Sequence, residues 1–297
     1  MKKLSVIIVT YNSEKDIFPC LDALFEHCDL PREELEVLVV DNASQNAEKM
    51  FDDIRLRYGN SVTLIRNSHN GGYGQGNNLG ISRAQAPVIM IMNPDVRLYQ
   101  PVLKTATDTF LQDDRLTMYG MKQMFSDTRK SPYSVVCTYM MNGYLHTLLT
   151  YLANRFDVFW PRYMYFSGSC FFVSKQKFQA IGMFDESVFL YGEEDDIHYR
   201  MCQKFGFHMK YNPKLHYIHP MHLREPNLDY ENTIIDIAIL QNEKKGYSRA
   251  RTIKNRLRNI RCLLWRAKLV HLFRHNMEDS ISFLQQRETY LKNLTLT

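Results

Sequence analysis

The sequence predicts an α/β protein in which a mainly parallel, Rossmann-like sheet is flanked by helices, with a helical extension at the C-terminus. Through the first hundred residues, short apolar runs rich in β-branched residues alternate with segments of helical spacing, which is typical of strand–helix–strand units. Each apolar run ends in a polar cluster. After Asp229 only the helical spacing remains.

The individual elements follow from apolar periodicity. The expected strands are 3–10, 35–40, 62–65, 88–92, 170–173, 208–211 and 215–218. The expected helices are 14–27, 47–58, about 77–84 and 175–181, with a further helix beginning at 193–196. Residues 132–165 are rich in Tyr, Met, Leu and Phe without a clean period. They are either an insertion that shapes an acceptor pocket or irregular core packing.

The composition is that of an ordinary globular protein: 45% hydrophobic, 12% aromatic and 23% charged. It excludes a disordered tail, a collagen and a disulfide-stapled miniprotein. The sequence contains no run of about eighteen apolar residues, so no membrane span is predicted. The apolar run after Lys3 is short and lacks a cleavage site, so it indicates a strand rather than a signal peptide. Six scattered cysteines predict reduced thiols, and the expected location is cytoplasmic.

The net charge of +5 hides an asymmetry. Residues 244–275 hold eleven Lys or Arg and no Asp or Glu, whereas the rest of the chain carries 26 basic and 32 acidic residues. A basic strip of this kind attracts phosphate, either on an anionic membrane surface or on nucleic acid.

Within this strip, apolar residues recur at three- and four-residue spacing, which predicts a basic amphipathic helix. They are Ile253, Leu257, Ile260, Leu264 and Ala267. The helix either touches a membrane surface, with the protein peripheral at the inner face of the cell membrane, or packs on the main domain with a solvated basic face. No nucleic-acid partner is expected, because no nucleic-acid-binding module is recognisable.

Polar residues follow several of the predicted strands. They are Tyr11-Asn12, Asp41, the Asn- and Gly-rich stretch 67–76, Asp95 and, after a later strand, His219. In an open α/β sheet, ligands bind beyond the carboxyl ends of the strands. Each residue alone could be a helix cap or a loop residue. Together they predict a crevice suited to a nucleotide and a divalent metal.

The stretch Gly72-Tyr73-Gly74-Gln75-Gly76 does not satisfy Gly-x-Gly-x-x-Gly and does not follow the first strand, so a classical NAD site is excluded. It is either backbone that a ligand can approach closely, with asparagines supplying hydrogen bonds, or a plain loop.

Two acidic features could carry chemistry. Asp95 and His219 offer a carboxylate oxygen and an imidazole nitrogen, which suit Mg²⁺ or Mn²⁺. The run Glu193-Glu194-Asp195-Asp196 either complements a helix dipole or, because crowded carboxylates raise one another's pKa, supplies a general base.

Five motifs in order resemble glycosyltransferase family 2, which has a GT-A fold, and most resemble its bacterial rhamnosyltransferase-like branch. The resemblance covers about Lys3 to His222. The motifs are Ser5–Ser13, Val39–Ser44, Arg66–Gly80, Asn93-Pro94-Asp95, and the block Gly182–Glu186 with Phe189–Asp196. It implies a domain over 1–228, with a nucleotide-sugar half (about 1–98) and an acceptor half (about 99–228), followed by a basic helical extension over 229–297.

The resemblance also implies roles for single residues. Nucleotide-binding residues would be Thr10, Tyr11, Asn12, Asp41, Asn67, Gly72, Gly74, Asn78 and Asn93. Asp95 and His219 would hold a divalent Mg or Mn ion. The family's base is usually Asp, but the ungapped alignment places Glu194 there, beside Glu193; a one-residue slip would make it Asp195.

The implied function is the metal-dependent transfer of a sugar with inversion, and rhamnose is one candidate for that sugar. The donor would be a dTDP- or UDP-sugar. The acceptor would be a glycan or lipid-linked glycan in cell-surface polysaccharide synthesis. A homo-oligomer is possible. Two alternatives are a non-catalytic nucleotide-sugar- or glycan-binding scaffold and a sugar-phosphate nucleotidyltransferase. The latter usually needs a basic, Gly-rich first loop, which Tyr11-Asn12-Ser13-Glu14 does not provide.

Overall fold

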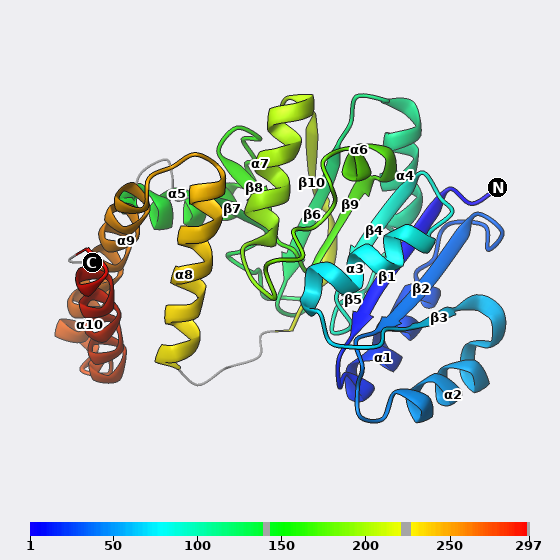
Figure 1. The fold of residues 1–297 in the computed structure, drawn as a ribbon, viewed down its shortest axis with the longest axis horizontal. Helices are drawn as coiled ribbons and strands as arrows, with labels where there is room; N and C mark the ends of the chain where they lie inside the picture. The colour runs from blue at the N-terminus through cyan, green and yellow to red at the C-terminus, as the bar shows by residue number, and fades with distance from the viewer. Residues whose placement is uncertain (139–142, 221–226, 296–297) are drawn as a thin grey trace. The chain divides into compact units, whose positions relative to one another are not determined.

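The structure, a computed structural model, describes residues 1–138, 143–220 and 227–295 (Figure 1). The chain forms two compact units. Unit 1 consists of Met1–Ser134 and Phe166–Met221, and unit 2 of Val135–Tyr165 and His222–Thr297. Residues 135–165, which the sequence placed in the acceptor half, therefore group with the C-terminal helices.

Unit 1 is built on an eight-stranded sheet in the order β3-β2-β1-β4-β9-β6-β10-β5. Strands β9 and β5 run antiparallel to their neighbours, and the remaining strand pairs are parallel. The strands are β1 (Leu4–Thr10), β2 (Leu35–Asp41), β3 (Thr63–Arg66), β4 (Val88–Met92), β5 (Arg97–Leu98), β6 (Met118–Met124), β9 (Cys170–Ser174) and β10 (Met209–Ile218). The predicted mainly parallel α/β class is confirmed.

Helices cover both faces of this sheet because its central strands are apolar on both sides. Val6 and Ile8 of β1 share a core with α1, α2 and α4, whereas Ile7 and Val9 face α3. The helices of unit 1 are α1 (Glu14–Glu26), α2 (Ala47–Tyr58), α3 (Gly72–Arg83), α4 (Leu103–Gln112), α6 (Lys175–Ala180) and α7 (Glu193–Phe205), with a 3₁₀ turn at Gly59–Ser61.

Two expected elements differ from the structure. The helix expected from about 77 begins at Gly72, because its glycines pack where a side chain would collide: a Cβ on Gly80 would lie 2.6 Å from Ile7 Cγ2. Close packing thus overrides the poor helix propensity of glycine. The strands expected at 208–211 and 215–218 are one strand, β10, whose register shifts between Asn212 and His216.

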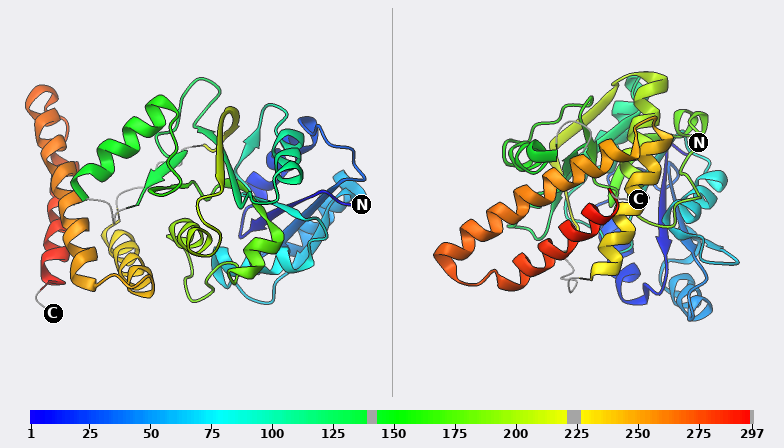
Figure 2. Two further views of the ribbon diagram at one scale, coloured as in Figure 1. Left: turned by 90° about the horizontal axis from the view of Figure 1, so that it is seen from above. Right: turned by 60° about the vertical axis from the view of Figure 1, so that its left-hand side comes forward.

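Unit 2 is mainly helical and has its own core. It contains α5 (Gly143–Phe156), α8 (Leu228–Lys244), α9 (Arg249–Arg274) and α10 (Glu278–Asn293), with a two-stranded sheet of β7 (Val135–Cys137) and β8 (Met164–Phe166). Helix α10 runs back along α9 (Figure 2). The apolar face predicted for 244–275 forms part of this core, in which Ile253 and Ile260 pack against Ile235, Ile239 and Leu291.

No helix in the described part of the chain is long and apolar enough to cross a membrane.

Candidate active site

The carboxyl ends of β1 and β2 form the first part of the site. Thr10 and Asp41 are paired in register, and the Thr10 hydroxyl donates to Asp41 Oδ1 over 3.1 Å. Ser44 donates to the same carboxylate twice, from its backbone N–H (2.9 Å) and its hydroxyl (2.5 Å). Asp41 is fully buried. Its carboxylate therefore fixes the loops that follow both strands.

The loop after β1 is held against the loop after β2. Asn12 adopts a left-handed backbone conformation (φ 50°), its N–H donates to Ser44 Oγ (2.8 Å), and its side-chain oxygen accepts from Gln45 N (3.1 Å). Asparagine tolerates this conformation better than most residues. Tyr11, between Thr10 and Asn12, is half exposed and presents an aromatic ring beside these fixed groups.

The start of α3 is tied to the same edge of the sheet. Asn67 donates to Asn42 Oδ1 (3.0 Å) and to Gln75 Oε1 (2.5 Å), and Asn42 donates to the Gly72 carbonyl (2.9 Å). Gly72 has a φ of +88°, and a Cβ there would lie 2.1 Å from the Phe189 carbonyl oxygen. Gly72 is thus required by its contact with the segment that precedes α7.

Two predicted nucleotide-binding residues contact the protein itself. A Cβ on Gly74 would lie 2.9 Å from Phe184 Cβ. The Asn78 amide donates to the Phe184 carbonyl (3.0 Å) and to Glu186 (2.8 Å), and its oxygen accepts from Phe184 N (3.0 Å). These residues therefore anchor the turn at 184–186 to α3, and their polar atoms are occupied by that turn.

The residues expected to hold a metal come together beyond β4 and β10. Asp95 Oδ1 lies 3.3 Å from His219 Nε2, and both side chains are partly exposed. The other ring nitrogen of His219, Nδ1, lies 3.3 Å from Gln123 Nε2. Asn93 stands two residues before Asp95, and its side-chain oxygen is buried without a hydrogen-bond partner. Burying an oxygen without a hydrogen-bond partner costs free energy unless a ligand supplies that partner.

The donor set fits a cation that takes most of its ligands from a bound diphosphate. One carboxylate oxygen and one imidazole nitrogen are acceptable to Mg²⁺ or Mn²⁺, and Mg²⁺ in particular commonly binds through one or two protein ligands plus phosphate. Among the described residues no group of three His, Cys, Asp or Glu side chains forms a cage of protein ligands. The pair Asp95 and His219 thus suits a shared site and not a self-contained structural one.

The acidic run begins α7. Burial, followed by the charge of Glu194, raises the pKa of Glu193 to about 8, and its Oε1 is buried without a partner. Burial also raises the pKa of Glu194, although the backbone N–H groups of Glu194 and Gly168 oppose this by hydrogen bonding the carboxylate. A carboxyl group with a raised pKa is a suitable general base near neutral pH.

The next two acidic residues are placed differently. Asp195 is half-buried. Asp196 is buried and accepts two hydrogen bonds from Arg200, at 2.9 and 2.5 Å, while Arg200 also donates to the Ile181 carbonyl (2.6 Å). Asp196 is therefore occupied by an ion pair that attaches α7 to the end of α6.

The tripeptide Ser167-Gly168-Ser169 joins the two halves of the site. The Ser169 carbonyl accepts from Asn93 N (2.8 Å), and its hydroxyl contacts Gln123 Oε1 (3.3 Å) and the Tyr217 hydroxyl (2.9 Å). Gly168 N–H hydrogen bonds Glu194, and the Gly168 carbonyl accepts from the Tyr73 hydroxyl (2.7 Å).

A Cβ on Gly168 would lie 2.2 Å from Glu194 Oε1 and 2.6 Å from Glu194 Cγ, so any larger residue here would displace the Glu194 side chain. Sequence reasoning missed this tripeptide. The signal that could have found it is a glycine between two serines immediately before a buried strand.

The sequence model described as glycosyl transferase family 2 matches residues 5–182. The poly(ribitol-phosphate) β-N-acetylglucosaminyltransferase TarS of Staphylococcus aureus is 30% identical over 140 residues, which is 46% of this chain and 23% of that protein. The low-salt glycan biosynthesis hexosyltransferase Agl10 of Haloferax volcanii is 27% identical over 207 residues, 66% of this chain and 61% of that protein. The matched segment thus spans about a quarter of TarS.

Solved structures share the fold at low sequence identity. The mannosyltransferase PcManGT from Pyrobaculum calidifontis, in complex with GDP-Man and Mn²⁺, superposes with a TM-score of 0.63 at 15% identity, covering 99% of this chain and 86% of that one. Residues 1–349 of S. aureus TarS, in complex with UDP-GlcNAc, superpose with a TM-score of 0.55 at 18% identity. The match covers 88% of this chain and 71% of that one. These likenesses confirm the GT-A fold.

Proposed function

Because the chain belongs to glycosyl transferase family 2, we propose that it transfers a sugar, with inversion, from a nucleoside-diphosphate sugar to a hydroxyl of a glycan or lipid-linked glycan. A UDP- or dTDP-sugar is favoured. The motifs resemble the rhamnosyltransferase-like branch, and TarS in complex with UDP-GlcNAc supports a uridine donor. The acceptor is proposed to belong to cell-surface polysaccharide synthesis, and similar proteins include a poly(ribitol-phosphate) β-N-acetylglucosaminyltransferase and a glycan biosynthesis hexosyltransferase.

The observation that carries this proposal is the connection through Ser167–Ser169. The carbonyl of Ser169 accepts a hydrogen bond from Asn93 N, two residues before Asp95, and the N–H of Gly168 hydrogen bonds the carboxylate of Glu194. A glycosyl transfer needs both: groups that bind the departing diphosphate and a base for the incoming hydroxyl. Fixing them to one short segment pre-organises the reacting groups, which lowers the barrier by removing orientational freedom in advance.

Glu194 is proposed as the base. Its carboxylate takes the proton of the acceptor hydroxyl while that oxygen forms a bond to the anomeric carbon. The bond from the anomeric carbon to the diphosphate oxygen breaks, and the nucleoside diphosphate leaves with the electron pair. Attack opposite the leaving group inverts the configuration, and no covalent enzyme intermediate forms. Glu193, with a pKa of about 8, is mostly protonated at neutral pH and adds little repulsion to Glu194.

Asp95 and His219 are proposed to hold a Mg²⁺ or Mn²⁺ ion, assisted by Asn93. When bound, such an ion neutralises charge on the leaving diphosphate. The protein's part is to hold the imidazole ring in place: the amide nitrogen of Gln123 lies 3.3 Å from Nδ1, and Nε2 faces Asp95. Gln123 is fixed by Ser169 and Tyr217 and orients the imidazole.

The nucleotide is proposed to lie over the ends of β1 to β3. Tyr11 is exposed and can contact the nucleoside directly, while Thr10, Asn12 and Asp41 fix the loop beneath it. Asp41, which is fully buried, is proposed to support the base site through its hydrogen bonds with Thr10 and Ser44. Asn67, Gly72, Gly74 and Asn78 are proposed to shape the site through the α3 contacts described above.

The first test is thermal stability with Mn²⁺ and a panel of UDP, dTDP, GDP, ADP and NAD⁺. A ligand that binds only the folded state raises the melting temperature. We expect a metal-dependent rise with one nucleoside diphosphate, lost in Asp95→Asn. No shift with any nucleotide would contradict the proposal.

The second test compares Glu194→Gln with Asp195→Asn, two isosteric changes at adjacent positions. Because general-base catalysis typically contributes about 100- to 10,000-fold, Glu194→Gln should lower turnover by at least about 100-fold with nucleotide binding retained. Asp195→Asn should stay within a few-fold of the unmodified protein. The reverse pattern would assign the base to Asp195, and unchanged turnover in both variants would remove the acidic run from the mechanism.

A further inference from the structure

Helix α5 is amphipathic in the opposite sense to an ordinary helix of a globular protein. Its buried side is small or polar, consisting of Gly143, His146, Thr150, Ala153 and Asn154. Its exposed side is apolar, consisting of Tyr144, Leu145, Leu148, Tyr151, Leu152 and Phe156, which are 37–67% exposed. A helix that only needed to be stable in water would present the opposite pattern.

The buried side of α5 is fixed by hydrogen bonds, so the helix cannot roll to hide its apolar side. Asn154 donates to the Val135 carbonyl (2.8 Å) and accepts from Val135 N (3.2 Å), while Thr150 accepts from Cys137 N (3.1 Å). A Cβ on Gly143 would lie 1.8 Å from the Asn255 carbonyl of α9. These contacts specify the orientation that exposes the leucine and aromatic side chains.

Helix α9 continues this surface. Its stripe of Trp265, Leu269, Leu272 and Phe273 recurs at positions that share one side of a helix, and these residues are 40–80% exposed. The same side includes Arg258, whose guanidinium lies 5.8 Å from the Tyr144 ring centroid. Helix α5 packs against α9, and the contact between Arg258 and Tyr144 joins the exposed sides of the two helices. We call the ten exposed apolar residues the α5–α9 surface.

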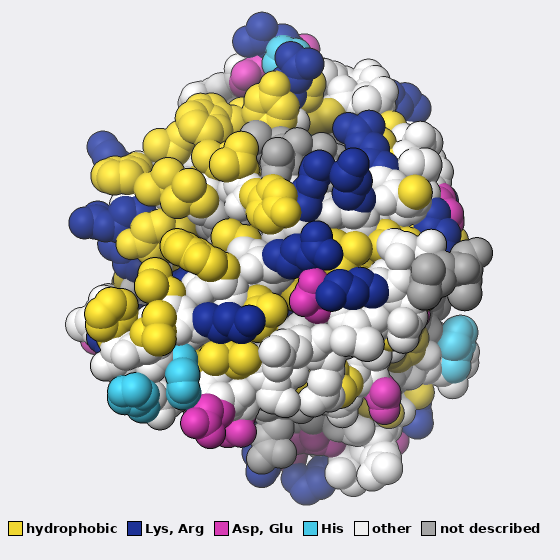
Figure 3. Space-filling view, turned by 90° about the vertical axis from the view of Figure 1, so that its left-hand side faces the viewer, with side chains coloured by type: hydrophobic (Ala, Val, Ile, Leu, Met, Phe, Trp, Pro, Cys, Tyr) yellow, Lys and Arg dark blue, Asp and Glu magenta, His cyan; other side chains and the backbone are white. Residues whose placement is uncertain are grey.

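The surroundings of the α5–α9 surface are strongly basic. Hydrophobic side chains gather on one face of the molecule with Lys and Arg among and beside them (Figure 3). The segment 244–275 contributes eleven Lys or Arg and no acidic residue. Two copies of such a surface placed against each other would repel, whereas an anionic surface complements it.

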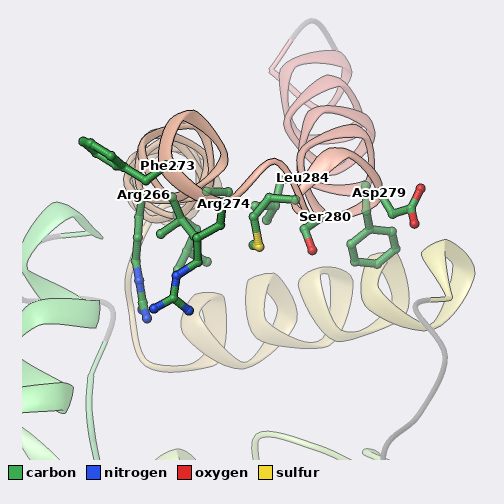
Figure 4. Close-up of a pocket in the computed structure, with 11 residues that line it drawn as sticks. Arg266, Phe273, Arg274, Asp279, Ser280 and Leu284 are labelled. Carbon is green, nitrogen blue, oxygen red and sulfur yellow. The ribbon is translucent and has the colours of Figure 1, made fainter.

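A cavity beside α9 has the same character. It has a volume of about 730 Å³ and lies between α9 and α10, with mainly apolar walls that include Val270, Phe273 and Leu284. Arg266 and Arg274 extend side by side from α9 at this cavity (Figure 4). The cavity is also lined by Asp279, so two guanidinium groups against one carboxylate leave a net positive charge among apolar walls, which suits an amphiphile that has a phosphate head.

We propose that the α5–α9 surface docks on the anionic face of a phospholipid bilayer. Its leucine and aromatic side chains enter the boundary between headgroups and acyl chains, while the Lys and Arg residues of 244–275 contact lipid phosphates. This extends the expectation for 244–275 by naming the side chains that enter the lipid, which are not those of the buried α9 face. The purpose of docking, access to a lipid-linked acceptor, rests on the proposed function, but the docking itself does not.

The test is flotation of the full chain with vesicles of phosphatidylcholine alone or mixed with phosphatidylglycerol, without nucleotide or acceptor. We expect binding to the mixed vesicles, weakened by salt. The double variant Leu148→Glu/Leu272→Glu should bind at least about tenfold less, because two apolar groups no longer enter the lipid. The matched control is Leu56→Glu/Leu111→Glu, at exposed leucines of unit 1, which should bind as the unmodified chain does.

Circular dichroism and nucleotide-induced stabilisation establish that each variant is folded, so a failure of docking is distinguished from a failure of the glycosyl-transfer site. The absence of flotation by the unmodified chain would overturn the proposal, as would equal flotation of both double variants. Sedimentation velocity adds a third outcome. Self-association that Leu148→Glu/Leu272→Glu abolishes, with no lipid binding, would assign the surface to a second copy of the chain.

Discussion

Glu193 shows how one buried carboxyl group can link stability to pH. Its pKa of about 8 means that the folded chain holds a proton there that the unfolded chain releases near the ordinary glutamate pKa of 4.5. Between these values the folded state binds more protons, so stability falls as pH rises, by up to about 1.4 kcal/mol per pH unit.

Glu193→Gln should remove this dependence, because glutamine carries no proton to lose. The measurement is the free energy of unfolding in urea at several pH values between 5 and 8. The variant should lose less stability than the unmodified chain over this range, and Glu26→Gln, at an exposed position on α1, should leave the slope unchanged. Equal slopes for the unmodified chain and Glu193→Gln would contradict the buried, protonated state.

At the same scale, the sequence was informative for some site residues and not for others. Asp95 and His219 were predicted as partners from chemistry alone, and the fold brings them to 3.3 Å. Asn78 was predicted among the nucleotide-binding residues, and the hydrogen bonds of its amide to the Phe184 backbone were not foreseen, because an Asn- and Gly-rich stretch does not reveal which distant turn its polar atoms contact.

Among elements, α3 depends most directly on the absence of side chains. A Cβ on Gly80 would lie 2.6 Å from Ile7 Cγ2 and 3.1 Å from Val40 Cγ2, so the helix rests directly on β1 and β2. Gly80→Val should therefore destabilise the fold by about 2 kcal/mol or more through overpacking. Ser82→Val, exposed on the same helix, should change stability by no more than about 0.5 kcal/mol. Chemical denaturation provides the comparison, and equal effects would refute the packing argument.

The elements that periodicity predicted well are those that bury apolar residues in the ordinary way, such as β1, α2 and β4. Apolar periodicity did not predict helix α5, because this kind of prediction takes apolar side chains to face inward, and in α5 they face outward. Helix α3 was placed too late because its glycines argue against helix when local propensity is all that is known. In both cases the deciding contacts are between segments far apart in the sequence, such as Asn154 with Val135.

For the molecule as a whole, the division into two units predicts how it unfolds. Unit 1 has a core formed by the sheet and its helices, and unit 2 has a separate core around Ile235, Ile253 and Leu291. Calorimetry of the full chain should therefore show two transitions. A nucleoside diphosphate with Mn²⁺ should raise only the transition of unit 1, since every proposed nucleotide contact lies there. A single transition that shifts as one would show that the units unfold together.

The glycine at position 168 also has a consequence for how the family can diverge. A Cβ of residue 168 would lie 2.2 Å from Glu194 Oε1 and 2.6 Å from Glu194 Cγ. The side chains at these two positions are therefore coupled. Homologues with glutamate or aspartate in this orientation at the position of Glu194 should keep glycine at the position of Gly168, whereas a side chain at position 168 should be accompanied by a different residue at the position of Glu194. The two positions should covary, and a collection of aligned sequences would reveal it without any enzyme being purified.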